Sequence, residues 1–180
     1  MEGIPGNVGG AIRMNAGAMG VETFDQVVSV SFIDQHGEIH EKTAQEIEHQ
    51  YRNVPEFSEN YVVSAVFQGR LEDSKNVATK IEESKSKRKS SQPVAASAGC
   101  IFKNPKEVPA GKLVEELGYK NRSVGKARVS KEHGNFIVND GGATAAEVLG
   151  LIEEIRLAAR DERNIELETE VQILGQQDPV

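Results

Sequence analysis

Short stretches rich in apolar and β-branched residues predict three strands in the first half of the chain. Residues 27–34 form the first stretch, and the turn residues His36 and Gly37 follow it. Residues 38–42 then predict the returning strand of a hairpin. Residues 61–68 contain enough β-branched and aromatic side chains to predict another strand.

Helix signals come from end residues and from apolar spacing. Acidic and capping residues at 72–74 begin a segment that becomes basic near residue 90, a polarity that suits the helix dipole. Residues 110–117 predict a short helix that ends at Gly118.

Two capping boxes predict further helices. Thr144 and Glu147 form one box, before a helix expected to run to about residue 163. Residues 43–46 form the other, and we expect a short helix from there to about residue 52. The helix after Thr144 carries an apolar stripe at helical spacing, which we expect to be core: Val148, Leu149, Leu151, Ile152, Ile155 and Ala159.

Two strands are expected late in the chain. Residues 136–139 form an apolar run before the turn at 140–142. Residues 166–174 alternate with period two, so Glu168, Glu170 and Gln172 would share one face. We therefore expect an α+β chain whose second half is an open mixed sheet, packed by the helices at 110–117 and 144–163.

Composition narrows the functional classes. The 180 residues carry a net charge of −7, which argues against a nucleic-acid partner. The single cysteine excludes an internal disulfide, and we expect no metal because no CxxC or His/Cys cluster is present. No apolar run is long enough to span a membrane, and residues 1–20 lack a signal-peptide pattern. A reducing, cytoplasmic setting fits best.

Candidate chemistry concentrates at residues 97–105, which hold the single cysteine, Cys100, after an Ala-Gly pair. Lys103 and Asn104 follow as a charge and a hydrogen-bonding amide. Small residues beside acid–base and polar side chains are typical of a site. The alternative is a buried structural cysteine next to a surface turn.

Several other candidates have an ordinary structural interpretation as well. The glycine-rich residues 3–18 could cradle a phosphate or a flat cofactor ring, or form a tight structural loop, and the G-x-G-x-x-G fingerprint is absent. Arg52 could be a solvated loop charge, and His133 a structural histidine. The basic cluster that includes Lys89 could be a solvated helix end or could meet a diphosphate.

Taken together, these motifs resemble the family of UDP-N-acetylenolpyruvoylglucosamine reductases, flavoenzymes that make UDP-N-acetylmuramate for peptidoglycan. The lack of a Tyr-bearing insertion after Arg52 resembles the shorter, type II branch. The matching segments occur in the family's order over nearly the whole chain: residues 3–11 with 14–18, residues 51–52, residues 97–105, residues 129–139 and residues 167–175.

The resemblance implies a reaction and three catalytic residues. NADPH reduces FAD, hydride reaches C3 of the enolpyruvyl ether, and C2 with its carboxylate becomes enolate-like. Arg52 and Glu170 match the groups that stabilise this charge. Cys100 stands where the family has the serine that donates a proton to C2, and a thiol with a pKa of about 8.5 can serve as that acid.

The resemblance also assigns binding residues. Lys103, Asn104, His133 and Lys89 would face the UDP-N-acetylglucosamine enolpyruvate substrate. The FAD-binding positions are those of the glycine-rich segment: Ile4, Pro5, Gly6, Asn7, Gly9, Gly10, Asn15 and Gly17.

The resemblance divides the chain into residues 1–70, the C-terminal part of a PCMH-type FAD-binding domain, and residues 71–180, a linker helix with the substrate-binding domain. The first part of the flavin domain has no counterpart here, so we expect the chain alone to bind FAD poorly, unless a missing N-terminal flavin-domain segment joins it as a partner. Two alternatives remain open: a nucleotide-sugar-binding module without chemistry, and another flavin enzyme on a related fold.

Overall fold

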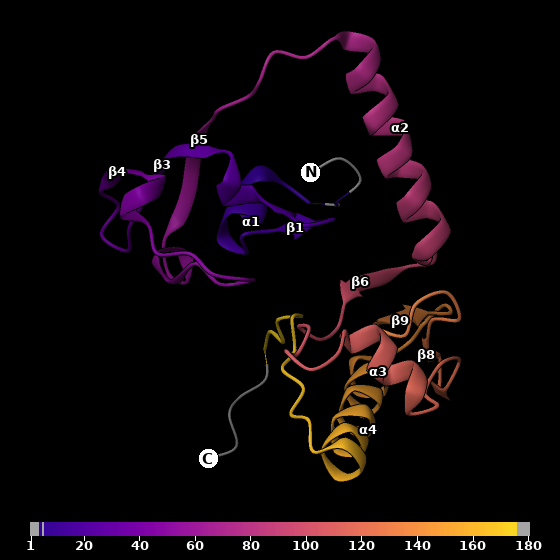
Figure 1. Cartoon of the computed structure of the whole chain (residues 1–180). Helices are drawn as coiled ribbons and strands as arrows, with labels where there is room; N and C mark the ends of the chain where they lie inside the picture. The colour runs from indigo at the N-terminus through magenta and orange to yellow at the C-terminus, as the bar shows by residue number, and fades with distance from the viewer. Residues whose placement is uncertain (1–3, 5, 176–180) are drawn as a thin grey trace. The chain divides into compact units, whose positions relative to one another are not determined.

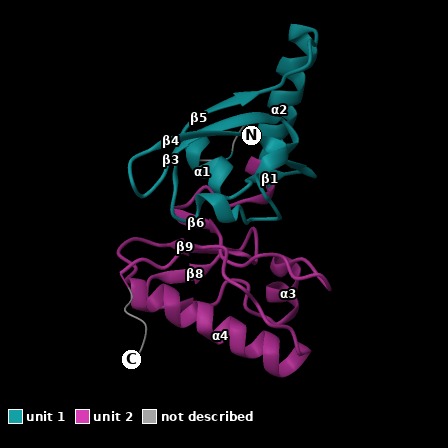
Figure 2. Cartoon of the chain, turned by 90° about the vertical axis from the view of Figure 1, so that its left-hand side faces the viewer, with its two compact units in different colours: residues 1–86 teal, residues 87–180 magenta. Residues whose placement is uncertain are grey.

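The computed structural model describes residue 4 and residues 6–175 of the chain. These residues belong to two compact units, residues 1–86 and residues 87–180 (Figure 2). Helices and sheets occur in both units, in agreement with the mixed α and β content that the sequence predicted. Within the described residues, no helix combines the length and the apolar character needed to cross a bilayer.

Unit 1 is built on an antiparallel sheet in which β3 lies between β4 and β5 (Figure 1). The three strands are β3 (Val27–Ile33), β4 (Ile39–Thr43) and β5 (Tyr61–Phe67). The β3–β4 hairpin turns at Gly37, whose φ of +85° favours glycine. All three strands were predicted, because short apolar runs separated by turn residues are a strong local signal.

Short elements surround this sheet. They are α1 (Val8–Arg13), β1 (Gly17–Ala18), β2 (Val21–Glu22), η1 (Thr23–Asp25), η2 (Ala44–Glu46) and η3 (Pro55–Phe57). The core of unit 1 consists of buried apolar side chains from these elements and from the inner face of the sheet: Ile12, Phe24, Val27, Val30, Phe32, Ile47, Val54 and Phe57.

The helix expected from residue 43 to about residue 52 is wrong beyond its first turn. The capping box between Thr43 and Glu46 forms, yet the helix is the single 3-10 turn η2. A capping box satisfies only the first orphan N–H groups, and residues 44–52 bury just one large apolar side chain, Ile47. A second turn would therefore have little to pack against.

The predicted linker helix is α2 (Ser74–Ser91), and the boundary between the two units falls within it. None of its residues is buried, and Arg88 and Lys89 lie in its last turn.

Unit 2 contains a four-stranded sheet with the order β6-β9-β8-β7. Its strands are β6 (Ser97–Cys100), β7 (Ser123–Val124), β8 (Ala127–Val129) and β9 (Phe136–Asn139). Every strand pair described in this sheet is antiparallel, so the mixed sheet expected from the sequence is wrong. The connections β7–β8 and β8–β9 are too short for the crossover that parallel neighbours require.

Two helices pack on this sheet. They are α3 (Ala110–Glu116) and α4 (Ala145–Arg163), and α4 contacts β7, β8 and α3. The capping box of Thr144 and Glu147 is confirmed, with the Thr144 hydroxyl accepting from the Glu147 N–H at 3.2 Å. The predicted stripe is core: Leu151, Ile152, Ile155 and Ala159 are buried, and Val148 and Leu149 pack against them.

The strand expected at residues 166–174 is also wrong. Thr169 makes one isolated bridge with Phe102, and no strand forms over these residues. Their partner segment is short, because it starts after the bulged strand β6 and meets Pro105, which has no N–H to donate. Leu167 still inserts into the core, with 2% of its surface exposed.

Candidate functional site

A cleft of about 250 Å³ opens in unit 2 between the end of β6, the first turns of α3 and the turn before β9. Pro109 and Gly111 contribute the α3 edge of its wall. The polar and ionisable side chains that line it come from all three segments: Cys100, Asn104, Lys112, Glu115, His133 and Asn135. Residues from two separate stretches of the sequence, 100–115 and 133–135, thereby line one hollow.

Cys100 ends β6, where it pairs in register with Phe136 of β9. The register shifts between Ser97 and Cys100, and Gly99 adopts a φ of +84° at this irregularity. A Cβ on Gly99 would meet nothing within 4 Å, so space does not require a glycine here. The positive φ is what favours glycine at this position. The bulge sets which way the end of the strand is directed, and the Cys100 side chain is partly exposed at the cleft.

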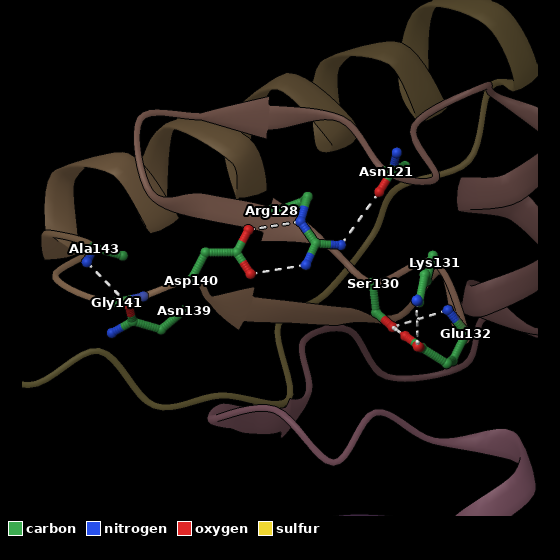
Figure 3. Close-up of polar contacts among 9 residues, drawn as sticks. All are labelled: Asn121, Arg128, Ser130, Lys131, Glu132, Asn139, Asp140, Gly141 and Ala143. Atoms are coloured by element: carbon green, nitrogen blue, oxygen red, sulfur yellow. Dashed lines mark hydrogen bonds and ion pairs between the residues drawn. The ribbon is translucent and has the colours of Figure 1, made fainter.

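The turn that carries His133 is fixed by the buried hydroxyl of Ser130. This hydroxyl accepts from the N–H groups of Glu132 (3.0 Å) and His133 (3.3 Å), and it donates to the Glu132 carboxylate at 2.6 Å. Figure 3 shows the Ser130–Glu132 pair beside the Arg128–Asp140 ion pair of the same sheet. The turn is therefore held by hydrogen bonds among its own residues.

The ring of His133 has a defined protonation pattern. Its Nδ1 accepts from the Asn135 N–H at 3.1 Å, which leaves the proton of the neutral ring on Nε2. Burial lowers the pKa of His133 below its ordinary value, although the carboxylate of Glu115 opposes that shift. A neutral imidazole with an Nε2–H donor therefore lines the cleft at neutral pH.

The α3 side of the cleft holds one amide and two opposite charges. Asn104 Oδ1 accepts from the Ala110 N–H at 2.9 Å, so this side chain supports the start of α3 while it lines the wall. The ion pair with Lys120, at 3.0 Å, lowers the pKa of Glu115. Lys112 carries the positive charge on this wall, and the sequence reasoning did not identify it.

Glu170 and Lys103 lie on two segments that are hydrogen-bonded to each other. The Glu170 N–H donates to the Ile101 carbonyl at 2.7 Å, next to Cys100. Lys103 is bonded to Glu168 twice, through its backbone N–H at 2.9 Å and through an ion pair at 3.1 Å. Neither Lys103 nor Glu170 lines the cleft, and neither does Lys89, which is exposed at the end of α2.

Arg52 belongs to unit 1, where its backbone has a φ of +55°. Its guanidinium donates to the carbonyl oxygens of Asn15 (3.3 Å) and Gly17 (2.9 Å) and stacks over the Tyr51 ring, 4.7 Å from its centroid. These contacts make Arg52 part of the framework that holds the glycine-rich segment.

The glycine-rich segment forms a short capped helix and a tight turn. Asn7 caps α1 by accepting from the Gly10 N–H at 2.7 Å, and a Cβ on Gly10 would lie 3.2 Å from the same Asn7 oxygen. Gly6 has a φ of +127°, and a Cβ there would meet nothing within 4 Å. Gly9 and Ile4 are both half-buried, whereas Pro5 lies outside the described residues.

Asn15 and Gly17 have structural roles in unit 1. Asn15 is fully buried with a φ of +41°, and its amide contacts the Glu22 carboxylate (2.7 Å) and the Phe24 N–H (3.1 Å). A Cβ on Gly17 would lie 2.5 Å from the Val21 carbonyl oxygen, so a side chain does not fit there. Gly6, Asn7 and Gly10 are exposed, and the Gly10 N–H is bonded to the Asn7 side chain.

Three residues that line the cleft were not identified from the sequence, because their side-chain types are not distinctive of a functional site. Gly111, Glu115 and Asn135 all line it, yet a glycine in a helix, a solvated glutamate and a buried asparagine give no distinctive sequence signal. Within the described residues, no group of three or more His, Cys, Asp or Glu side chains is placed to hold a metal ion.

Comparison with known proteins relates the chain to one family. Residues 91–174 match the family model described as UDP-N-acetylenolpyruvoylglucosamine reductase, C-terminal domain. Curated relatives of the same name include one from Syntrophus aciditrophicus, 43% identical over 175 residues, which cover 97% of this chain and 56% of the relative. Another, from Bacillus velezensis, is 39% identical over 176 residues, or 96% of this chain and 58% of the relative.

A solved structure gives the same relation. The crystal structure of UDP-N-acetylenolpyruvylglucosamine reductase (MurB) from Thermus caldophilus superimposes with a TM-score of 0.79 at 37% identity. The match covers 94% of this chain and 61% of that one. The chain thus spans little more than half the length of the relatives it matches.

Proposed function

The chain belongs to the UDP-N-acetylenolpyruvoylglucosamine reductase family, and on this premise we propose that its unit 2 binds UDP-N-acetylglucosamine enolpyruvate for flavin-dependent reduction to UDP-N-acetylmuramate. The reductant would be NADPH, and the product a cytoplasmic precursor of peptidoglycan. One observation carries the proposal: three residues expected at the site, Cys100, Asn104 and His133, line one cleft.

Substrate binding by this cleft has a chemical basis. Lys112 offers an ammonium group for a phosphate oxygen, and the neutral His133 ring offers its Nε2–H. The Asn104 amide keeps its NH₂ donors while its oxygen accepts from Ala110. We also assign Lys103 and Lys89 to the substrate from the family pattern, as residues that would act outside this cleft.

Reduction of an enol ether needs a hydride at one carbon and a proton at its neighbour. We assign the proton to the Cys100 thiol, because a positioned thiol can serve as a general acid. We assign Arg52 and Glu170 to the enolate-like charge that develops as the hydride arrives. A cation and a hydrogen-bonding acid aimed at that charge lower the barrier because they bind it more strongly than the ground state.

The flavin would be held by unit 1, at the exposed backbone of Gly6, Asn7 and Gly10, within a domain we place at residues 1–70. FAD, reduced by NADPH, supplies the hydride when it is bound. Arg52, Asn15 and Gly17 shape the turn that follows α1, through the contacts described above.

A second function, a nucleotide-sugar-binding module without chemistry of its own, is favoured by the location of the cleft. All of its lining residues belong to unit 2, so the contacts proposed for the sugar nucleotide in this cleft come from unit 2. The two functions differ in one outcome, which is turnover after binding.

Calorimetric titration of the full chain with UDP-N-acetylglucosamine enolpyruvate tests the proposal. We expect saturable binding that is about tenfold weaker in His133→Ala, the effect of one lost hydrogen bond of about 1.4 kcal/mol. The matched control is His36→Ala, in the exposed hairpin turn of unit 1, which should bind as the unaltered chain does.

Adding FAD and NADPH to the same samples separates the two functions. Oxidation of NADPH that depends on the substrate supports the reductase, and binding without oxidation supports the module. Absence of binding to the unaltered chain, or equal binding by His133→Ala, would contradict both.

A further inference from the structure

Asn135 is a buried polar residue that lines the cleft, and the proposed reaction gives it no role. Its surface is 3% exposed. Its amide oxygen accepts from the Phe102 N–H at 2.9 Å, and its amide nitrogen donates to the Phe102 carbonyl at 2.7 Å. One side chain thus satisfies both backbone groups of a residue whose own surface is 1% exposed.

The backbone explains why a side chain takes this role. β6 and β9 pair at Cys100 and Phe136, and the Ile101 N–H continues the pairing to the Asn135 carbonyl at 2.9 Å. At the next position the chain before β9 has turned away, since the Phe136 N–H is bonded to the His133 carbonyl at 3.1 Å. The amide of Asn135 replaces the missing strand partner of Phe102.

The same short segment also holds the residues around Glu170. The Ile101 carbonyl accepts from the Glu170 N–H at 2.7 Å, and Phe102 bridges to Thr169. Ile101 therefore gives its N–H to Asn135 and its carbonyl to Glu170, and Cys100 directly precedes it. The positions of the Cys100 thiol and of the Glu170 backbone therefore both depend on the Ile101–Phe102 segment, which Asn135 holds.

We propose that Asn135 is a positioning residue that fixes Ile101 and Phe102, and through them sets the placement of Cys100 and Glu170. The link to the reaction rests on the function proposed above, whereas the mechanical link between Asn135 and Cys100 does not. An asparagine is suited to this task because it combines a donor and an acceptor. Aspartate keeps only the acceptor, and alanine keeps neither.

The thiol itself reports on the mechanical link, because Cys100 is the only cysteine in the chain. In Asn135→Ala we expect the rate of alkylation by iodoacetamide at fixed pH to rise about tenfold, as the buried groups of Phe102 lose their partners. Asn135→Asp should lie between this variant and the unaltered chain, and it serves as the second variant if Asn135→Ala does not fold.

The matched control is Asn139→Ala, at the last residue of β9, whereas Asn135 directly precedes that strand. Asn139 also accepts from two backbone N–H groups, those of Gly141 and Ala143, both at 2.9 Å, but in the exposed turn after β9 (Figure 3). Its alkylation rate should remain within about twofold of the unaltered chain. Equal rates in the Asn135 and Asn139 variants would refute the proposal.

Hydrogen exchange distinguishes positioning from a general loss of stability. Positioning predicts faster exchange at the amides of Phe102 and Glu170 in Asn135→Ala, with unchanged protection at Val129 and Val138 in the rest of the sheet. Faster exchange at all four amides would show a merely structural role and would overturn the proposal.

Titration with UDP-N-acetylglucosamine enolpyruvate then tests the link to the reaction. We expect binding to weaken about tenfold in Asn135→Ala and to be retained in Asn139→Ala. If the unaltered chain does not bind, the proposed function fails while the alkylation result still decides the mechanical link. If Asn135→Ala binds normally despite a faster thiol reaction, the role in the site is refuted.

Discussion

Replacing Gly111 by alanine tests how closely the two walls of the cleft are packed. A Cβ at this position in α3 would lie 2.7 Å from Cε1 and 3.1 Å from Nδ1 of His133, whereas ordinary contacts start at 3.4 Å. Moving the His133 ring would break two contacts. Its Nδ1 accepts from the Asn135 N–H at 3.1 Å, and the ring makes an edge-type contact with the Phe136 ring, with centroids 5.0 Å apart. The substitution must therefore displace the ring or the helix.

Two opposing effects determine how much Gly111→Ala changes the free energy of unfolding. Alanine in place of glycine stabilises a helix by up to about 1 kcal/mol. Overpacking costs about 1–3 kcal/mol, and losing the Asn135–His133 hydrogen bond costs about 1 kcal/mol more. We expect net destabilisation of about 1–3 kcal/mol, which lowers the Tm of a unit of this size by about 5–20 °C.

Differential scanning calorimetry measures the shift, and hydrogen exchange of peptides from α3 and α4 assigns the transition to unit 2. The matched control is Gly150→Ala in α4, where a Cβ would meet only Val124 Cγ1 at 4.0 Å. That variant should be more stable than the unaltered chain. The same substitution, glycine to alanine, is therefore expected to lower the Tm at position 111 and to raise it at position 150.

Proton NMR titration of the histidine rings gives a second result for Gly111→Ala. If the ring is pushed toward solvent, the pKa of His133 should rise toward its ordinary value, because burial is what lowers it. A Tm that rises as in Gly150→Ala, together with an unchanged His133 titration, would refute the reasoning.

Three further predictions concern the proton donor, the pH dependence of stability and the helix cap. In a preparation that binds FAD and turns over, Cys100→Ser should retain substantial turnover whereas Cys100→Ala should stall after flavin oxidation, and single-turnover absorbance follows both; equal turnover would remove the thiol from the mechanism. Because burial lowers the pKa of His133 below 6.5, the unfolded chain binds its proton more tightly, so the unfolding free energy should fall as the pH drops from about 7 toward the folded pKa. Urea unfolding should show a weaker pH dependence in His133→Gln, and an identical slope would contradict this cause. Thr144→Ala should lower the stability of unit 2 by about 1 kcal/mol, measured by the same unfolding, because the Glu147 N–H loses its cap; an unchanged midpoint would show that the cap contributes nothing.

Local signals predicted most of the secondary structure. Strand β3 and its hairpin followed from an apolar run and a Gly37 turn, and α4 followed from the Thr144 box and a helical stripe. The secondary-structure predictions failed where contacts between distant segments, and not local sequence, determine the structure. Residues 166–174 alternate as a strand would, yet their partner segment ends at Pro105, and one bridge at Thr169 is all that forms.

From the sequence, only site residues with recognisably reactive or hydrogen-bonding side chains could be predicted. Cys100 and Asn104 were identified from the residue types at positions 97–105 and His133 through a family resemblance, and the fold brings them to one cleft. Asn135 and Gly111 were missed because their importance comes from what they touch: a buried amide that pairs with a backbone, and a missing Cβ that admits a ring. Neither property can be read before the packing is known.

A crystal structure of the chain bound to UDP-N-acetylglucosamine enolpyruvate tests the central claim most directly. We predict that the sugar nucleotide occupies the cleft of unit 2, with the enolpyruvyl group beside the Cys100 thiol. Electron density for the ligand away from this cleft would contradict the account.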